Sequence, residues 1–202
     1  MTIPDRIANW IANEERLAAD AAWLEKTSPV TGRVNRWLAR SRAVDVALAV
    51  AAARTAQPAW AERPPVERGL ILHSLVSAMQ RRRDDLAGAV AADTGKSLKD
   101  AAGEVGGSIQ LGLFFASEGQ RLYGRTTTSG TAHRQVMTVR EPVGVAGLIV
   151  PANTPIANIA WKVFPALVCG NTAVLKAAED APAIAWLFAE CTHEADVPSG
   201  VF

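Results

Sequence analysis

Asn153 has a residue type and a position that could stabilise negative charge on a small ligand. It follows the apolar run 143–150 and precedes a sequence typical of a helix start. Backbone N–H groups and the helix dipole favour negative charge at a helix N-terminus, so an added amide donor would suit a developing oxyanion. Asparagine also often satisfies backbone groups in turns, and the sequence alone leaves both interpretations open.

Lys176 and Glu179 form a second polar pair with possible chemistry. Lys176 directly follows the short apolar run 172–175, and Glu179 lies near the start of the last expected helix. Their amine and carboxylate could hydrogen-bond the ribose hydroxyls of a nucleotide, or they could form an ordinary salt bridge in a loop. A carboxylate at a ribose would repel a 2′-phosphate, which favours NAD over NADP.

Lys162 is a cation on a helix that is otherwise almost entirely apolar, expected over residues 155–169. Asn158 lies four positions before it and therefore on the same helix face. A lysine in such a setting either extends its amine to water or reaches a polar partner.

The elements that must position these residues form a strand, helix, strand unit. Residues 143–150 are expected to be a buried strand, Thr154 and Pro155 to start the helix, and Gly170 to end it before a second strand at 172–175. Two strands connected in this way are parallel, so their carboxyl ends share one edge of the sheet. Open α/β sheets bind ligands at that edge.

The sequence predicts an α/β protein: part of a Rossmann-like parallel-sheet domain preceded by a helical region. We expect a helical arm at 1–26, with its helix over 4–24, and a mainly helical part of the cofactor domain at 27–120. A region with an exposed strand at 133–140 follows at 121–141. An incomplete βαβα unit completes the chain at 142–202, its last helix spanning about 181–195 behind an Asp180 cap.

Composition excludes several other classes of protein. The 202 residues carry a net charge of +1, so nothing indicates nucleic acid, and no apolar run resembles a membrane span. Two cysteines make neither a disulfide framework nor a zinc site, and a reducing cytoplasm is expected. The three histidines have no metal-ligand spacing, so no metal is expected.

Two phosphate-binding motifs are absent. Gly95-Lys96-Ser97 resembles the end of a P-loop, but Val90 stands where that motif needs glycine, and a helix rather than a strand precedes it. The G-x-G-x-x-G fingerprint is also missing, because Gly144 and Gly147 lie inside the expected strand.

The longest motifs, EPVGVAGLIVPANTP at 141–155 and AWKVFPALVCGNTAVLKAAEDAP at 160–182, resemble those of the aldehyde dehydrogenase superfamily. The likeness extends in the same order to PVTG at 29, PAW at 58, PPVERG at 64, DTGKS at 93 and the final PSGVF. It covers about residues 27–202.

The resemblance implies oxidation of an aldehyde to an acid with NAD or NADP through a cysteine thiohemiacetal. It implies that Asn153 belongs to the oxyanion hole with a backbone N–H, and that Lys162 relays charge or supports the site. It also implies that Lys176 and Glu179 contact the cofactor ribose, with Ala178 between them. Cofactor contacts are likewise implied for the loop that consists of Val150, Pro151 and Ala152. The strand at 133–140 would belong to an oligomerisation region, so self-association is implied.

The chain departs from the family pattern in two ways. Ala152 stands where the family usually has tryptophan and Thr154 where it usually has phenylalanine. The chain also ends at Phe202, before the family's general-base glutamate and nucleophilic cysteine, and neither Cys169 nor Cys191 matches that cysteine.

We therefore expect the N-terminal part of an NAD-dependent aldehyde dehydrogenase, inactive by itself, whose remaining residues come from a longer chain or a C-terminal partner polypeptide. One alternative is a non-catalytic remnant that binds nucleotide or forms oligomers. A weaker alternative is a relative that transfers the acyl group to CoA.

Overall fold

The two predicted strands, β8 (Val145–Ile149) and β9 (Thr172–Lys176), form a parallel pair in the computed structural model, which describes residues 3–202. The strands pair in register from Val145 opposite Thr172 to Ile149 opposite Lys176. Helix α5 (Pro155–Val168) joins them. The predicted strand, helix, strand unit is therefore confirmed, and both strands end at the same edge.

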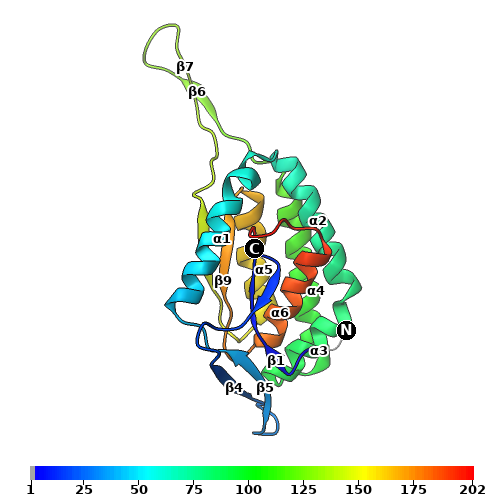
Figure 1. Cartoon of the computed structure of the whole chain (residues 1–202). Helices are drawn as coiled ribbons and strands as arrows, with labels where there is room; N and C mark the ends of the chain where they lie inside the picture. Colours follow the sequence, from blue (N-terminus) through cyan, green and yellow to red (C-terminus); the bar gives the residue numbers. More distant parts are fainter. Residues whose placement is uncertain (1–2) are drawn as a thin grey trace.

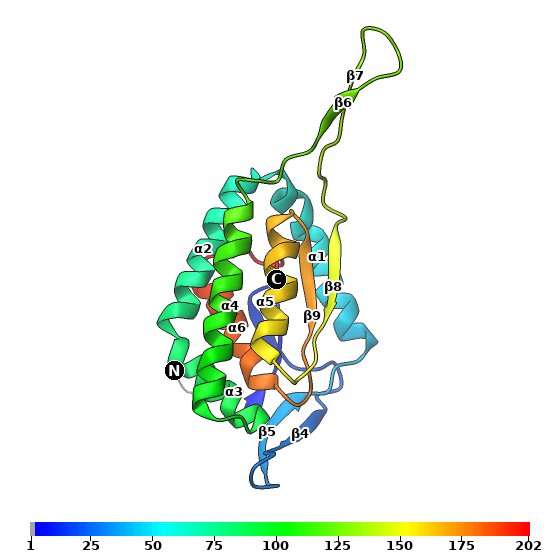
Figure 2. The same cartoon turned by 180° about the vertical axis from the view of Figure 1, so that it is seen from behind.

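Helix α1 (Ala43–Glu62) and helix α5 cover opposite faces of this strand pair (Figure 2). Two buried hydrogen bonds fix α1 in place. The Thr172 hydroxyl donates to the Ala53 carbonyl at 3.0 Å, and the Trp60 indole N–H donates to the Leu167 carbonyl at 3.0 Å.

The strand pair lies between two helices, but the burial predicted for the first strand is wrong. No residue of β8 is buried and Ile149 is 69% exposed, because β8 pairs only with β9 among the described residues and its other edge is open. In β9, Thr172 and Ala173 are buried.

Four further helices form a layer on the outer side of α5: α2 (Pro65–Arg81), α3 (Arg83–Thr94), α4 (Leu98–Glu118) and α6 (Pro182–Glu194). Helix α4 packs closely on α5 because Gly112 has no side chain. A Cβ atom at Gly112 would lie 2.7 Å from the Phe164 ring and 2.6 Å from Val76. The core here is dominated by fully buried apolar side chains, among them Phe164, Phe188, Leu72 and Met79.

The predicted helical arm at the N-terminus is wrong. The segment folds into the short strands β1 (Arg6–Ile7), β2 (Asn9–Ile11), β3 (Glu14–Arg16) and β4 (Trp23–Thr27). Residues 1 and 2 of the predicted arm lie outside the described residues.

The physical reason is a partner strand that lies later in the sequence. Strand β5 (Val34–Ala39) pairs with both β1 and β4, and its position also shows that the part 27–120 is not helical before Ala43. Ala12 and Asn13 take positive φ angles of 58° and 63°, which no helix accommodates. Apolar positions that fit one helix face are here shared among short strands, because tertiary pairing overrides local propensity.

The region 121–141 forms a hairpin that projects from the body of the molecule (Figure 1). Its strands β6 (Thr126–Thr128) and β7 (Gln135–Met137) pair antiparallel, and all six residues are exposed. The strand predicted at 133–140 is shorter than expected and pairs within its own chain. The hairpin lies at the opposite end of the molecule from the carboxyl ends of β8 and β9 (Figure 2).

The cap predicted for the last helix is also wrong. Helix α6 begins after Ala181, and the carboxylate that accepts the Ala183 N–H, at 3.0 Å, belongs to Asp93 at the end of α3 rather than to Asp180. Within residues 3–202, no helix combines the length and apolarity needed to cross a bilayer.

Candidate active site

The candidate site lies at the carboxyl edge of β8 and β9, where each strand runs into a polar loop. Val150 is buried and its N–H donates to the Lys176 carbonyl at 3.3 Å, so the two loops begin side by side. Pro151 is exposed and Ala152 is half-buried. The structure therefore brings the residues predicted after the first strand next to those predicted after the second.

The Asn153 side chain presents its amide nitrogen as a free donor. Its oxygen accepts a hydrogen bond from Asn158 Nδ2 at 3.3 Å, and the same nitrogen donates to the carbonyl of Thr154 at 3.0 Å and to its hydroxyl at 2.9 Å. Of the two polar atoms of the Asn158 amide, only the nitrogen can donate to the Thr154 carbonyl, so this amide has one orientation, and that orientation fixes Asn153. Among residues 3–202, Asn153 Nδ2 donates to no acceptor, and the residue is exposed.

The N-terminus of α5 is capped by Glu104, a residue of α4 that the sequence did not single out. Glu104 Oε1 accepts the N–H groups of Ile156 at 3.1 Å and Ala157 at 3.4 Å. Thr154 takes the N-cap position as predicted, but its hydroxyl caps no backbone N–H. The expectation that free helix N–H groups would add to Asn153 is therefore wrong for these two amides.

Lys96 connects this cap to the loop. Its ammonium donates to Glu104 Oε2 at 2.5 Å and to the carbonyl of Asn153 at 2.6 Å. Lys96 belongs to the DTGKS segment, which resembles a P-loop only superficially but does contact the candidate site. No sequence pattern pairs Lys96 with Glu104, because they lie eight positions apart and a helix starts between them.

Lys162 reaches a polar partner. Its ammonium donates to the carbonyl of Ile149, the last residue of β8, at 2.6 Å. This contact supports the second of the two predicted interpretations, and it ties the middle of α5 to the strand end that precedes Asn153. Lys162 thus contacts the strand end from α5 and is not itself part of the loop that carries Asn153.

Lys176 and Glu179 form a salt bridge of 2.7 Å, and their side chains are 61% and 64% exposed. The hydrogen bond from Lys176 lowers the pKa of the Glu179 carboxyl below its usual range, so this group is ionised at neutral pH. Ala178, between them, is buried. An exposed ammonium and carboxylate offer the donor and acceptor that a pair of ribose hydroxyls requires, so this donor set fits a nucleotide.

Neither cysteine is placed to attack a carbonyl beside Asn153. Cys191 is fully buried on α6, and burial raises the pKa of its thiol to about 12. Cys169 is the C-cap residue of α5 and lies at the end of that helix remote from Asn153. The described part of the chain also contains no cluster of side chains that could hold a metal ion.

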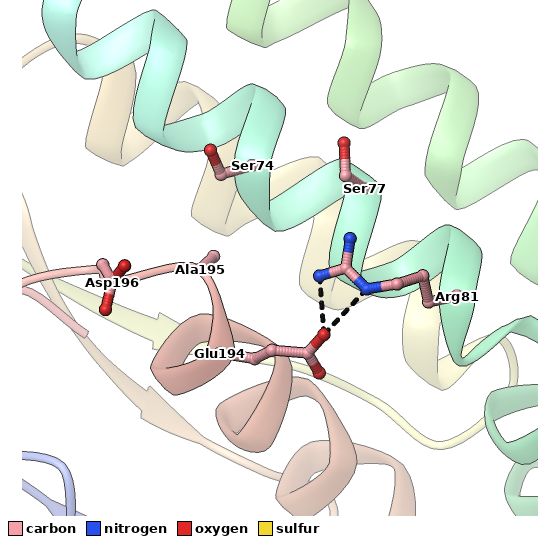
Figure 3. A pocket seen from close by; sticks show the side chains of 6 residues that line it. All are labelled: Ser74, Ser77, Arg81, Glu194, Ala195 and Asp196. Carbon is pink, nitrogen blue, oxygen red and sulfur yellow. Dashed lines mark hydrogen bonds and ion pairs between the residues drawn. The ribbon is translucent and has the colours of Figure 1, made fainter.

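A separate surface pocket lies between α2 and α6 (Figure 3). Arg81 donates two hydrogen bonds to Glu194 Oε1, at 2.9 and 2.6 Å, and the hydroxyls of Ser74 and Ser77 donate to carbonyls of their own helix. None of its lining residues belongs to the carboxyl edge of the strands. The pocket is therefore not part of the candidate site.

Comparison with known proteins gives one consistent result. The family model described as "Aldehyde dehydrogenase family" matches residues 17–202. An alpha-ketoglutarate semialdehyde dehydrogenase from Haloferax volcanii is 37% identical over 202 residues, which is all of this chain and 42% of the relative. A succinate-semialdehyde dehydrogenase [NADP(+)] from Escherichia coli is 36% identical over 89% of this chain and 37% of its own length.

Solved structures agree with the sequence relatives. The crystal structure of an E. coli NADP dependent enzyme superposes with a TM-score of 0.95 at 34% identity, covering 98% of this chain and 41% of that one. An NAD-dependent aldehyde dehydrogenase from Sinorhizobium meliloti gives 0.93 at 32% identity, covering 98% and 40%. The chain thus spans about two fifths of the length of the relatives it matches.

Proposed function

Because the chain belongs to the aldehyde dehydrogenase family, we propose that it supplies part of the active site of a nicotinamide-dependent aldehyde dehydrogenase. The proposed reaction converts an aldehyde, an oxidised nicotinamide cofactor and water into a carboxylic acid, the reduced cofactor and a proton. The cofactor, when bound, accepts the hydride. The relatives include several semialdehyde dehydrogenases, so aldehydes of that class are the first substrates to test.

The observation that carries the proposal is the free amide donor of Asn153. Its oxygen is engaged by Asn158, so its Nδ2 hydrogens are directed away from that contact and toward solvent at the carboxyl edge of the sheet. A positioned donor of this kind stabilises the carbonyl oxygen as it gains negative charge during attack on the aldehyde. Lys162 supports this role indirectly, by holding the strand end through the Ile149 carbonyl.

The attacking thiol is assigned to a residue other than Cys169 and Cys191. A thiol with a pKa of about 12 is almost entirely protonated at neutral pH, and a nucleophile needs a positioned base. The 202-residue chain by itself is therefore expected to be inactive. Formation of reduced cofactor from an aldehyde by this purified chain would contradict that expectation.

For the cofactor, Lys176 and Glu179 are proposed to hold a ribose, with the backbone from Val150 to Ala152 alongside. The ionised Glu179 carboxylate favours NAD over NADP, because it would repel a 2′-phosphate. Relatives with either cofactor in their names exist, so the proposed preference rests on Glu179 and not on membership of the family.

The test of the proposed function is the substitution Asn153→Ala in the active enzyme, that is, in the complete enzyme that contains this chain together with the remaining residues. Loss of one oxyanion donor typically lowers kcat about 10²–10³-fold. Gln110→Ala is the matched control, because it removes an exposed amide from the neighbouring helix α4 and should leave kcat unchanged. Equal kcat values for the wild type and Asn153→Ala would overturn the assigned role.

A second candidate function is a module that binds nucleotide or self-associates without catalysis. It is favoured by the positions of the two cysteines among residues 3–202, because Cys191 is buried in α6 and Cys169 lies at the end of α5 remote from Asn153. Both candidates predict binding of NAD in a calorimetric titration. An assay of aldehyde oxidation with the remaining residues of a complete enzyme present distinguishes the two, because only the first candidate predicts that reaction.

Self-association is proposed through the hairpin β6–β7. Val136, Met137 and Val139 are exposed on or beside it, and its strands have free edges. A charged substitution, Val136→Glu, is expected to shift the mass measured by light scattering toward that of a monomer. An unchanged mass would remove the hairpin from the interface.

A further inference from the structure

Lys96 and Glu104 form a two-point contact on the loop that carries Asn153. Glu104 Oε1 accepts the N–H groups of Ile156 and Ala157, while Lys96 donates to the carbonyl of Asn153 itself. The two side chains are joined by an ion pair of 2.5 Å. The part of the connection that leads into α5, from Asn153 to Ala157, is therefore held by one residue just before α4 and one in its second turn.

The surroundings of this pair make its contacts strong. The Glu104 side chain is only 7% exposed and that of Lys96 is 27% exposed. Hydrogen bonds that involve ionised groups are shorter and stronger than neutral ones, and partial burial reduces their screening by solvent. The surface salt bridge of Lys176 and Glu179 has no comparable protection, since both side chains are more than half exposed.

A helix cap alone would not need Lys96. Glu104 satisfies the two α5 amides with one oxygen, and its second oxygen could remain hydrated. Lys96 instead uses that second oxygen as an anchor while it binds the backbone of Asn153. The carbonyl of a residue fixes the position from which its side chain starts, so this contact determines where the free amide donor lies.

We propose that the Lys96–Glu104 pair is a positioning element for Asn153, which holds its amide in the place required for oxyanion stabilisation. The inference rests on the proposed function of Asn153. Glu104 also balances the partial positive charge at the N-terminus of α5, because its carboxylate accepts the N–H groups of Ile156 and Ala157. The stabilisation of an oxyanion here then comes from the Asn153 side chain rather than from the amides of Ile156 and Ala157.

A double-mutant cycle in the active enzyme tests the proposal. Glu104→Ala is expected to lower kcat about tenfold in the wild-type background and less than about twofold in the Asn153→Ala background, because residues that act through one another are not additive. Lys96→Met is expected to behave in the same way. Lys99→Met and Glu118→Gln serve as matched controls, because they remove an exposed lysine and a helix α4 glutamate that lie outside this contact.

The cycle separates failure of the inference from failure of the proposed function. If Asn153→Ala leaves kcat unchanged, the proposed function fails. If Asn153→Ala lowers kcat but Glu104→Ala has the same effect in both backgrounds, only the positioning role fails. Glu104→Gln retains an acceptor for the Ile156 amide, so it keeps the cap and is expected to lose only the contribution that passes through Lys96.

A readout on the 202-residue chain tests the contact without any activity. Hydrogen exchange measured by NMR should be at least about tenfold faster at the Ile156 and Ala157 amides in Glu104→Ala than in the wild type. The Ala183 amide, capped by Asp93, provides the internal reference. Unchanged exchange at Ile156 and Ala157 would show that Glu104 does not hold the start of α5, which would overturn the inference.

Discussion

Helices α5 and α6 both begin on a carboxylate from another helix, but the two caps differ in how their charge is balanced. Glu104 of α4 caps α5 with one oxygen and pairs its second oxygen with Lys96. Asp93 of α3 caps α6 through the Ala183 N–H, while its Oδ1 is buried without a hydrogen-bond partner among residues 3–202.

The difference shows how a cap becomes part of a site. The counter-ion of Glu104 makes a second contact, to Asn153, and thereby links the helix start to the candidate donor. Burial raises the pKa of Asp93 to about 6, despite the opposing charges of Arg36 and Lys26. The first cap is thus connected to the candidate site, whereas the second is a titratable group inside the core.

The largest effect that this comparison predicts concerns pH and stability. The folded pKa of Asp93, about 6, lies above its unfolded value near 3.8, so the neutral carboxyl stabilises the fold fully below pH 4 and this contribution is lost as pH rises through 6. The shift corresponds to about 3 kcal/mol. Denaturant unfolding of wild type and Asp93→Asn should therefore give a difference in free energy that changes by about this amount between pH 4 and pH 8.

The matched substitution in the other cap is Glu104→Gln. It breaks an ion pair rather than removing an unpaired buried charge, so it is expected to destabilise the fold at pH 8 by about 1–2 kcal/mol, whereas Asp93→Asn is stabilising there. The same sign for both substitutions at pH 8 would contradict the comparison.

The second prediction concerns the orientation of Asn153. In Asn158→Asp the new carboxylate has no hydrogen to donate to the Thr154 carbonyl and instead accepts from Asn153 Nδ2, which consumes the free donor. We expect kcat of the active enzyme to fall about 10–100-fold. Asn158→Leu is the control, because it removes the contact without binding the amide and should cost only a few-fold. Equal losses in the two variants would show that Asn158 does not orient Asn153.

The smallest predicted effect concerns the exposed salt bridge of Lys176 and Glu179, in the loop that follows β9. Glu179→Gln removes the carboxylate that opposes a 2′-phosphate, so the ratio of NADP to NAD affinity should rise about tenfold, a modest change because the site is open to solvent. Glu118→Gln, which alters another exposed ion pair, is the control. Titration of the chain with each cofactor measures the ratio, and an unchanged ratio would remove Glu179 from the cofactor site.

The sequence predicted the strand, helix, strand unit because its signals are local. Pro155 and Gly170 mark the two ends of the helix, and the apolar runs on either side form the two strands, although β8 is less buried than its apolar run predicts. The N-terminal strands escaped prediction because β1 depends on pairing with β5, about thirty residues later. Local periodicity carries no information about such a partner.

The candidate site was predictable to a similar extent. Asn153, Lys162, Lys176 and Glu179 follow strand ends or interrupt an apolar helix, and these are positions that a sequence reveals. The contact between Glu104 and Ile156 joins residues that are 52 positions apart, and the contact between Asp93 and Ala183 joins residues that are 90 positions apart. Buried carboxylates that cap distant helices are set by packing, so only the structure shows them.

The most direct test of this account is the side-chain amide exchange of Asn153 and Asn158, measured by NMR on the 202-residue chain. The Asn153 Nδ2 hydrogens should exchange as fast as those of an exposed asparagine, while those of Asn158, bonded to Thr154 and Asn153, should exchange at least about tenfold more slowly. Protection of the Asn153 amide, or equal exchange at both residues, would contradict the claim that Asn158 holds Asn153 with its donor free.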